Sequence, residues 1–147
     1  MSFPSHPTSS VDIFLTHDHR ACDQAWAAVE EAPADQVATP FKEFDHQLRR
    51  HLEWEEETLF PAFEQATGMF GMGPTQVMRS EHEGMRGLLD QMGEAVAAGD
   101  RDQLVDLGDT LLMLIQQHNL KEEQVLYPMM ASRIGADWPE LLTRLRA

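Results

Sequence analysis

The sequence carries twice a short pattern in which a histidine is followed four residues later by a glutamate. One copy runs from His51 to Pro61 and the other from His118 to Pro128. Both begin His-x-x-x-Glu-Glu and close with an apolar pair followed by proline. Four residues advance a helix by one turn plus about 40°, so the histidine and the glutamate lie on one face. Both side chains can therefore reach one metal ion, and the two copies predict two facing helices around a shared metal site.

Six ionisable residues fall on the faces that the expected helices would bury. They are His19, His51, Glu55, His82, His118 and Glu122. Burying such groups costs several kcal/mol each unless they are paired or bind a metal. In one interpretation they satisfy one another as hydrogen-bonded His–Glu pairs. One histidine on each of four helices, together with two glutamates at the same spacing, favours metal binding instead.

The donor set indicates the kind of metal centre. Four imidazoles and two carboxylates are nitrogen and oxygen ligands, and six ligands exceed the four that a tetrahedral zinc site takes. The set suits two metal ions bridged by Glu55 and Glu122, with two histidines on each ion. Iron fits this mixture, and manganese fits it less well. None of the four candidate histidines follows a glutamate at the Glu-x-x-His spacing of ferritin-like di-iron bundles, so the arrangement of ligands differs from that class.

Other polar residues fit a ligand role less well. His46 has charged helical neighbours, His17 points about 200° away from His19, and His6 lies in an N-terminal arm. Glu56 and Glu123 come five residues after their histidines, about 140° away in a regular helix, and are expected at the surface or supporting the ligands. Four more side chains are expected to form core or pocket wall: Cys22, Trp26, Trp54 and Tyr127.

The elements that would position the ligands are four amphipathic helices. We expect them at about residues 10–31, from about 35 or 40 to a glycine-rich loop at 68–74, at 74–98 and at 101–133, with a short helix in the tail beyond. The apolar stripe of the second includes Leu59 and Ala62, and that of the fourth continues through Val125 and Met129. Pro61 should kink or loosen the second helix. Short connections predict an all-α fold, an antiparallel up-down-up-down four-helix bundle.

Composition sets further bounds. The 147 residues suit a single domain over residues 1–147, with its core at about 10–133 and a short C-terminal tail. A net charge of −14, from 25 acidic and 11 basic residues, argues against nucleic acid and anionic membrane surfaces as partners. The one cysteine excludes an intramolecular disulfide, and no signal-like or membrane-spanning run is evident, so the cytoplasm is the expected location.

At this point the sequence resembles the hemerythrin-like family, the HHE cation-binding domains, in its H–HxxxE–H–HxxxE branch. The matching stretches are Asp18-His19-Arg20, His51 to Glu55, Glu81-His82 and His118 to Glu122, and the resemblance covers about residues 10–133. It implies a non-haem di-iron centre, bridged by an oxo or hydroxo group, that reacts with dioxygen or nitric oxide. In that centre the four histidines would be terminal ligands and the two glutamates would be bridges.

The chain departs from the oxygen-carrying members of that family in two ways. Those carry a second histidine on the third helix, four residues from the first, where this chain has Met78 and Arg86. Their last carboxylate is an aspartate five residues after its histidine, whereas Glu122 comes at four. The missing histidine favours binding or sensing of the gas, or response to redox state, over stable oxygen carriage. The alternatives are a di-iron enzyme acting on peroxide or nitric oxide, an iron donor in metal-centre repair, and a structural metal bundle.

Overall fold

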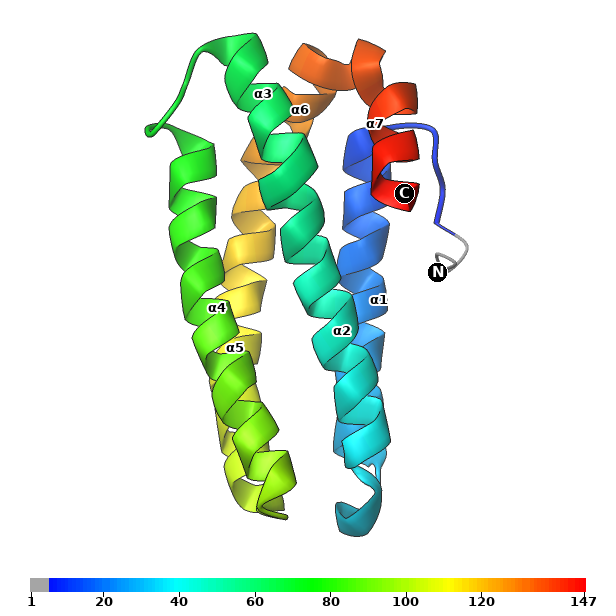
Figure 1. The fold of residues 1–147 in the computed structure, drawn as a ribbon, viewed down its shortest axis with the longest axis vertical. Helices are drawn as coiled ribbons and strands as arrows, with labels where there is room; N and C mark the ends of the chain where they lie inside the picture. The colour runs from blue at the N-terminus through cyan, green and yellow to red at the C-terminus, as the bar shows by residue number, and fades with distance from the viewer. Residues whose placement is uncertain (1–5) are drawn as a thin grey trace.

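The protein is an all-α, antiparallel four-helix bundle, as the computed structural model of the chain shows for residues 6–147 (Figure 1). Two of the four long segments are interrupted by a π-helical turn, and a short helix follows the last. The helices are α1 (Val11–Glu31), α2 (Ala38–Trp54), α3 (Phe60–Thr67), α4 (Pro74–Ala97), α5 (Arg101–Lys121), α6 (Tyr127–Ile134) and α7 (Trp138–Arg146). The π turns are η2 (Glu55–Leu59), between α2 and α3, and η3 (Glu122–Leu126), between α5 and α6, while η1 (Ala34–Gln36) and η4 (Gly135–Asp137) are single 3₁₀ turns.

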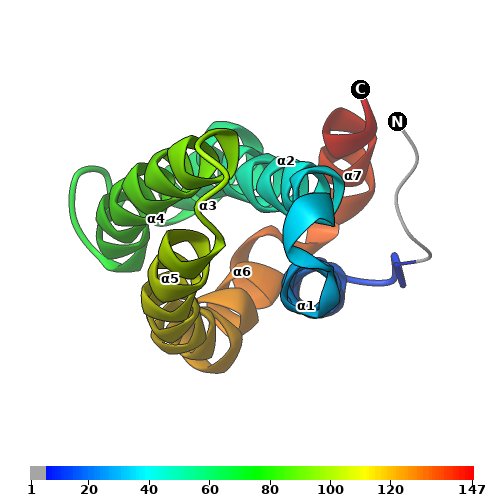
Figure 2. The same cartoon turned by 90° about the horizontal axis from the view of Figure 1, so that it is seen from below.

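The bundle consists of two helical hairpins packed side by side. The helix pairs α1 with α2 and α4 with α5 form the hairpins, while α2 contacts α4 and α1 contacts α6 across them. An end-on view shows these segments at the corners of a square, with α7 outside it against the α2 side (Figure 2). Within the described part of the chain, none of the helices is long and apolar enough to cross a membrane.

Local chemistry explains where several of the helices begin and end. The Asp100 carboxylate accepts a hydrogen bond from the Gln103 N–H and caps the start of α5. Gly68 ends α3 in the left-handed conformation, with φ of 75°, which a residue without a Cβ adopts at little cost. Pro74 opens α4, where its missing N–H would have had no helical partner. These positions agree with the predicted helix ends.

Each π turn ends two residues before a proline. The rings of Pro61 and Pro128 cannot donate a helical hydrogen bond, and they crowd the carbonyl four residues earlier. The helix widens to relieve this crowding: the N–H of Phe60 bonds the carbonyl of Glu55, and the N–H of Tyr127 bonds that of Glu122. Each bond spans five residues instead of four, so each turn contains one extra residue.

The extra residue rotates the buried face of the chain beyond each π turn, which corrects two parts of the predicted stripes. Val125 and Met129 were expected in the core, but they are 55% and 36% exposed. Leu126 and Met130 take their places at 1% and 0%. On the other hairpin, Ala62 is only partly buried, and its neighbour Phe63 is fully buried. A period of 3.6 residues, continued through the π turn, predicts the wrong face.

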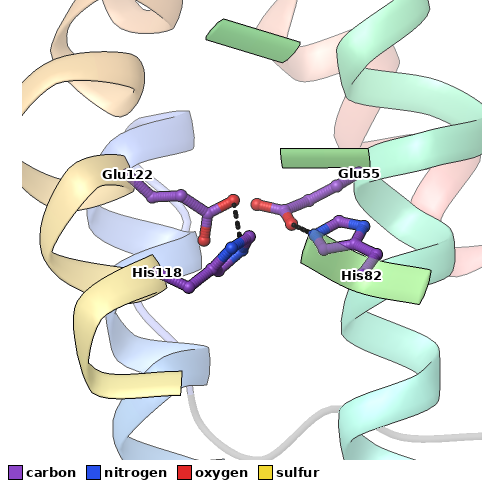
Figure 3. A group of neighbouring side chains, drawn as sticks. All are labelled: Glu55, His82, His118 and Glu122. Atoms are coloured by element: carbon purple, nitrogen blue, oxygen red, sulfur yellow. Dashed lines mark ion pairs between the residues drawn. The ribbon is translucent and has the colours of Figure 1, made fainter. Parts of the chain in front are cut away.

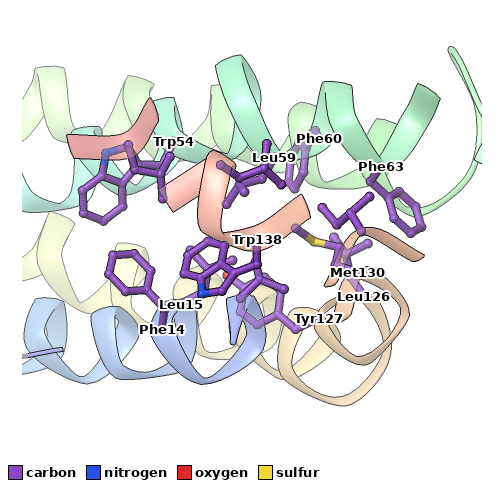
Figure 4. Packing of buried hydrophobic residues seen from close by; sticks show 14 of the residues in the cluster. Phe14, Leu15, Trp54, Leu59, Phe60, Phe63, Leu126, Tyr127, Met130 and Trp138 are labelled. Carbon is purple, nitrogen blue, oxygen red and sulfur yellow. The ribbon is translucent and has the colours of Figure 1, made fainter. Parts of the chain in front are cut away.

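The apolar core forms two clusters at opposite ends of the bundle. One, here called the tail-side cluster, lies where α3, α6 and α7 meet the start of α1 and includes Phe14, Trp54, Tyr127 and Trp138 (Figure 4). The other, here called the hairpin-side cluster, lies toward the α1–α2 and α4–α5 connections and is centred on aromatic and aliphatic side chains such as Trp26, Phe44, Met85, Leu89 and Leu111. The tail therefore packs on the bundle as predicted, and polar side chains occupy the layer between the clusters.

The close packing of Gly108 against Trp26 gives a stability prediction. A Cβ added at Gly108 would lie 2.1 Å from the Trp26 ring. We expect Gly108→Ala to lower the free energy of unfolding by about 1–3 kcal/mol, because overpacking outweighs the better helix propensity of alanine. Gly87→Ala is the matched control, since nothing lies within 4 Å of its added Cβ on exposed α4 surface. Thermal denaturation that ranks Gly108→Ala above the control would contradict this packing.

Candidate metal centre

The fold brings the six predicted ligand residues together in the polar layer between the two apolar clusters. All are buried, with exposed fractions of 3% or less: His19, His51, Glu55, His82, His118 and Glu122. Their donor atoms form two groups, and within each group the atoms lie within 4.8 Å of one another. One group holds both glutamates with His82 and His118, and the other holds His19 and His51 with Glu122.

The half of the layer around His82 and His118 presents four donor atoms to one point (Figure 3). The Nε2 atom of His82 lies 3.1 Å from Oε1 of Glu55, and Nε2 of His118 lies 3.3 Å from Oε2 of Glu122. All four atoms are buried and lack a hydrogen-bond partner. Because buried polar atoms are nearly always satisfied, four orphaned donors converging on one place fit a metal ion. Ligands held about 2.1 Å from a metal lie about 3 Å apart when adjacent, which agrees with these spacings.

The half around His19 and His51 contains a further oxygen atom, the hydroxyl of Tyr127. It lies 3.0 Å from Nε2 of His19 and 3.2 Å from Nε2 of His51. It donates to Oε2 of Glu55 at 2.6 Å or to Oε1 of Glu122 at 2.9 Å. These distances are again those between adjacent donors around one metal. The chemistry of the donor set thus adds the Tyr127 oxygen to this half.

Each central glutamate faces both halves of the layer. Glu55 directs Oε1 to His82 and Oε2 to Tyr127 and His51. Glu122 directs Oε2 to His118 and Oε1 to His19, the latter at 3.1 Å. A carboxylate whose two oxygens point to different sets of imidazoles is placed to bridge two ions.

A second ring of carboxylates orients the histidines. Each histidine donates its Nδ1–H to a carboxylate on another segment, and these pairs are His19–Glu123 at 2.6 Å, His51–Asp18 at 2.7 Å, His82–Glu56 at 2.7 Å and His118–Glu81 at 2.9 Å. Such bonds fix the tautomer and the ring orientation and leave Nε2 as the inward donor. All four imidazoles therefore present the same atom to the centre.

Every outer carboxylate also contacts a basic side chain. Glu56 binds the guanidinium of Arg86 through both oxygens, at 2.7 and 2.9 Å, and Glu123 binds that of Arg20 at 2.9 and 3.2 Å. The remaining contacts are Lys121 with Glu81 and the His6 ring with Asp18. Arginine forks hold carboxylates in a fixed plane, so these contacts rigidify the ring around the site. They also balance its negative charge.

The pKa values of the metal-free centre follow from the same contacts. Burial disfavours the charged form of His51, but the charge of Glu55 and the hydrogen bond to Asp18 outweigh it and raise the pKa of His51 well above its usual range. Burial likewise opposes ionisation of Glu55, yet the nearby His51 holds the pKa of that carboxyl well below its ordinary value. For Tyr127, burial and the two central carboxylates together raise the phenol pKa. Without metal, the layer is therefore stabilised by protonated His51 paired with the ionised carboxylate of Glu55.

The structure also shows where the residues lie for which other roles were predicted from the sequence. Glu56 and Glu123 contact the predicted ligand histidines His82 and His19, which agrees with the supporting role predicted as one of two alternatives. The helix around them, however, is not regular. The exposed His17 stays outside the donor groups, as does His6, which contacts Asp18 behind the ligand histidine His51. Tyr127 was expected only as core or pocket wall, and its hydroxyl role was missed. The internal repeat could have indicated this role, because it aligns Tyr127, directly before Pro128, with Phe60, directly before Pro61.

Comparison with known protein families found one match. The model of the hemerythrin HHE cation-binding domain matches residues 12–130. Comparisons with curated proteins and with solved structures found no match.

The two adjacent glutamates of η3 should differ in their effect on metal content. Glu122 faces both halves of the layer, whereas Glu123 contacts His19 from its Nδ1 side and also binds Arg20. We expect Glu122→Ala to lose at least one ion. Glu123→Ala should keep the wild-type metal content at excess metal, with affinity weakened about 10–100-fold. Metal analysis after desalting measures the difference, and the opposite order would show that η3 presents Glu123 to the metal.

The metal-free protein should be most stable in mildly acid solution. The raised pKa values of His19, His51 and His118 give stability that is complete below about pH 6.5 and is lost as the pH rises through them. The lowered pKa values of Asp18 and Glu55 give stability that is lost as the pH falls below about 4.5. The melting temperature of chelator-treated protein should therefore fall between pH 6 and pH 9.

Metal should remove this dependence at alkaline pH, because it replaces the protons on the inward nitrogens and stabilises the folded state by mass action. Circular dichroism melts of metal-free and metal-loaded protein across that range make the comparison. A metal-free protein that melts equally at pH 6 and pH 9, or as high as the loaded one, would contradict the description of the layer.

Proposed function

Because the chain belongs to the hemerythrin HHE cation-binding domain family, we propose that it binds two iron ions and uses them to bind dioxygen or nitric oxide. In this proposal the protein is a sensor of the gas or of redox state rather than an oxygen carrier. Membership of the family establishes a metal-binding helical protein. The number of ions, their identity and the gas are inferred from the residues of the layer.

The observation that carries the proposal is the pair of donor groups that share the central carboxylates. His82 and His118 would hold one ion, and His19, His51 and Tyr127 would hold the other. Glu55 and Glu122 would bridge the two ions, since each turns one oxygen to either half. One ion would leave half of the donors unused, and two ions employ all of them.

The ligand chemistry favours iron. Imidazole nitrogens and carboxylate and phenol oxygens are a mixed set that suits iron, and among residues 6–147 no cysteine joins the donor groups to favour a softer metal. Bound iron supplies reversible binding of a diatomic gas and one-electron exchange with it. The protein holds the imidazoles in one orientation through the outer carboxylates and keeps bulk water away by the two apolar clusters.

A small apolar cavity beside the layer limits what could reach it. It has a volume of about 10 Å³ and is lined by three of the histidines and Asn119 together with five less polar side chains: Cys22, Leu48, Leu52, Met85 and Ile115. That is about the space of one water molecule. So small a space would admit a small uncharged gas more readily than a charged metabolite, which is larger and would have to shed its hydration.

The proposal predicts the response of the reduced, iron-loaded protein to gases. Protein purified with iron should contain two ions per chain, and its absorption spectrum should change within seconds to minutes of anaerobic exposure to nitric oxide or of exposure to dioxygen. Wild-type protein that takes up no iron, or whose loaded centre responds to neither gas nor to azide after oxidation, would leave only a structural role for the metal.

Steady-state assays separate this function from the enzymatic one. A sensor should consume peroxide or nitric oxide at most stoichiometrically with its iron. Sustained turnover beyond that ratio would select the enzyme acting on peroxide or nitric oxide. Transfer of iron to an apo-acceptor protein would select a role in metal-centre repair.

A further inference from the structure

The two halves of the polar layer are related by the internal repeat but differ at one side chain. The repeat aligns His51 with His118, Glu55 with Glu122 and Phe60 with Tyr127. Phe60 and Tyr127 both begin a helix directly after a π turn, and both are fully buried, at 0% and 1% exposure. The difference between them is a single hydroxyl group.

The two rings take matching places beside the ligands. The Phe60 ring stacks on His82 with centroids 5.7 Å apart and an interplanar angle of 20°. The Tyr127 ring stacks on His19 with centroids 5.4 Å apart and an angle of 27°. A hydroxyl on Phe60 would therefore occupy, in its own half, the place that the Tyr127 hydroxyl has in the other.

The two halves also differ in hydrogen bonding, because Phe60 lacks the hydroxyl oxygen that Tyr127 has. In the Tyr127 half, the inward atoms of both histidines and one oxygen of each glutamate lie within hydrogen-bond distance of the phenol. In the Phe60 half, the four equivalent atoms are buried and unpartnered: His82 Nε2, His118 Nε2, Glu55 Oε1 and Glu122 Oε2. One half thus offers five protein donors and the other four.

From this asymmetry we infer that the ion between His82 and His118 is the one that takes the external ligand, at the coordination position left by Phe60. The Tyr127 oxygen fills the equivalent position on the ion between His19 and His51. The inference rests on the proposed function and goes beyond it, because it assigns the gas to one ion and identifies Phe60 and Tyr127 as the residues that decide which.

A purely structural role for Tyr127 makes a different prediction. If its hydroxyl only satisfied the neighbouring polar atoms, the two ions would have equal numbers of protein donors and would both accept a ligand. Moving the hydroxyl from one ring to the other would then have no systematic effect on ligand binding.

Azide titration of the oxidised, iron-loaded protein tests the inference with a single small anion. We expect Phe60→Tyr to keep both ions and to weaken azide binding by at least about tenfold, because the new oxygen fills the open position. The double variant Phe60→Tyr with Tyr127→Phe should bind azide with close to wild-type affinity, because the open position has moved to the other ion. Phe63→Tyr, on the same buried stretch of α3, is the matched control and should leave azide affinity unchanged.

Tyr127→Phe provides a readout that does not depend on azide. It removes one atom, so the fold should persist, and chelator competition should show one ion held about tenfold or more weakly than in the wild-type protein. Unchanged affinity for both ions in Tyr127→Phe, or unchanged azide binding in loaded Phe60→Tyr, would overturn the inference. Wild-type protein without two iron ions would instead overturn the proposed function, and metal analysis reveals that before any variant is compared.

Discussion

The structure depends on the cost of keeping ionisable side chains inside an apolar bundle. A buried carboxylate or imidazolium is tolerated only when other groups neutralise it and use its hydrogen-bonding capacity. Here that compensation extends outward in steps, from the central donors to a ring of carboxylates and from that ring to basic side chains such as Arg20 and Arg86. If one set of partners were removed, the charged groups directly inside it would be buried without a partner, which would destabilise the folded protein.

The same contacts join the two helical hairpins. The bonds of His51 to Asp18 and of His118 to Glu81 lie within a hairpin, linking α1 to α2 and α4 to α5. The bonds of His19 to Glu123 and of His82 to Glu56 cross between hairpins. The crossing pairs use the glutamate that follows each central glutamate, at the start of a π turn. The widened turns therefore help to position the groups that align one hairpin with the other.

Spacing along the sequence predicted the bundle and singled out six side chains that the fold brings together, because residues four apart lie on one face of any regular helix. It failed where the helix is not regular. Pro61 predicted a kink or a loosened helix, but the helix contains a π turn instead, and this shifts the buried face from Ala62 to Phe63. The Tyr127 hydroxyl was missed because its role depends on side chains from three other segments, which no interval along one helix encodes.

The division of the apolar core into two clusters has a consequence for folding. The tail-side and hairpin-side clusters each unite segments from all around the bundle, and the polar layer separates them. Hydrophobic contact alone would let each end open and close as an independent cooperative unit. Ions that ligate all four long segments at mid-height would couple the ends into a single transition. Metal release would then convert one cooperative molecule into two loosely linked ones, a change that amide hydrogen exchange would resolve along each helix.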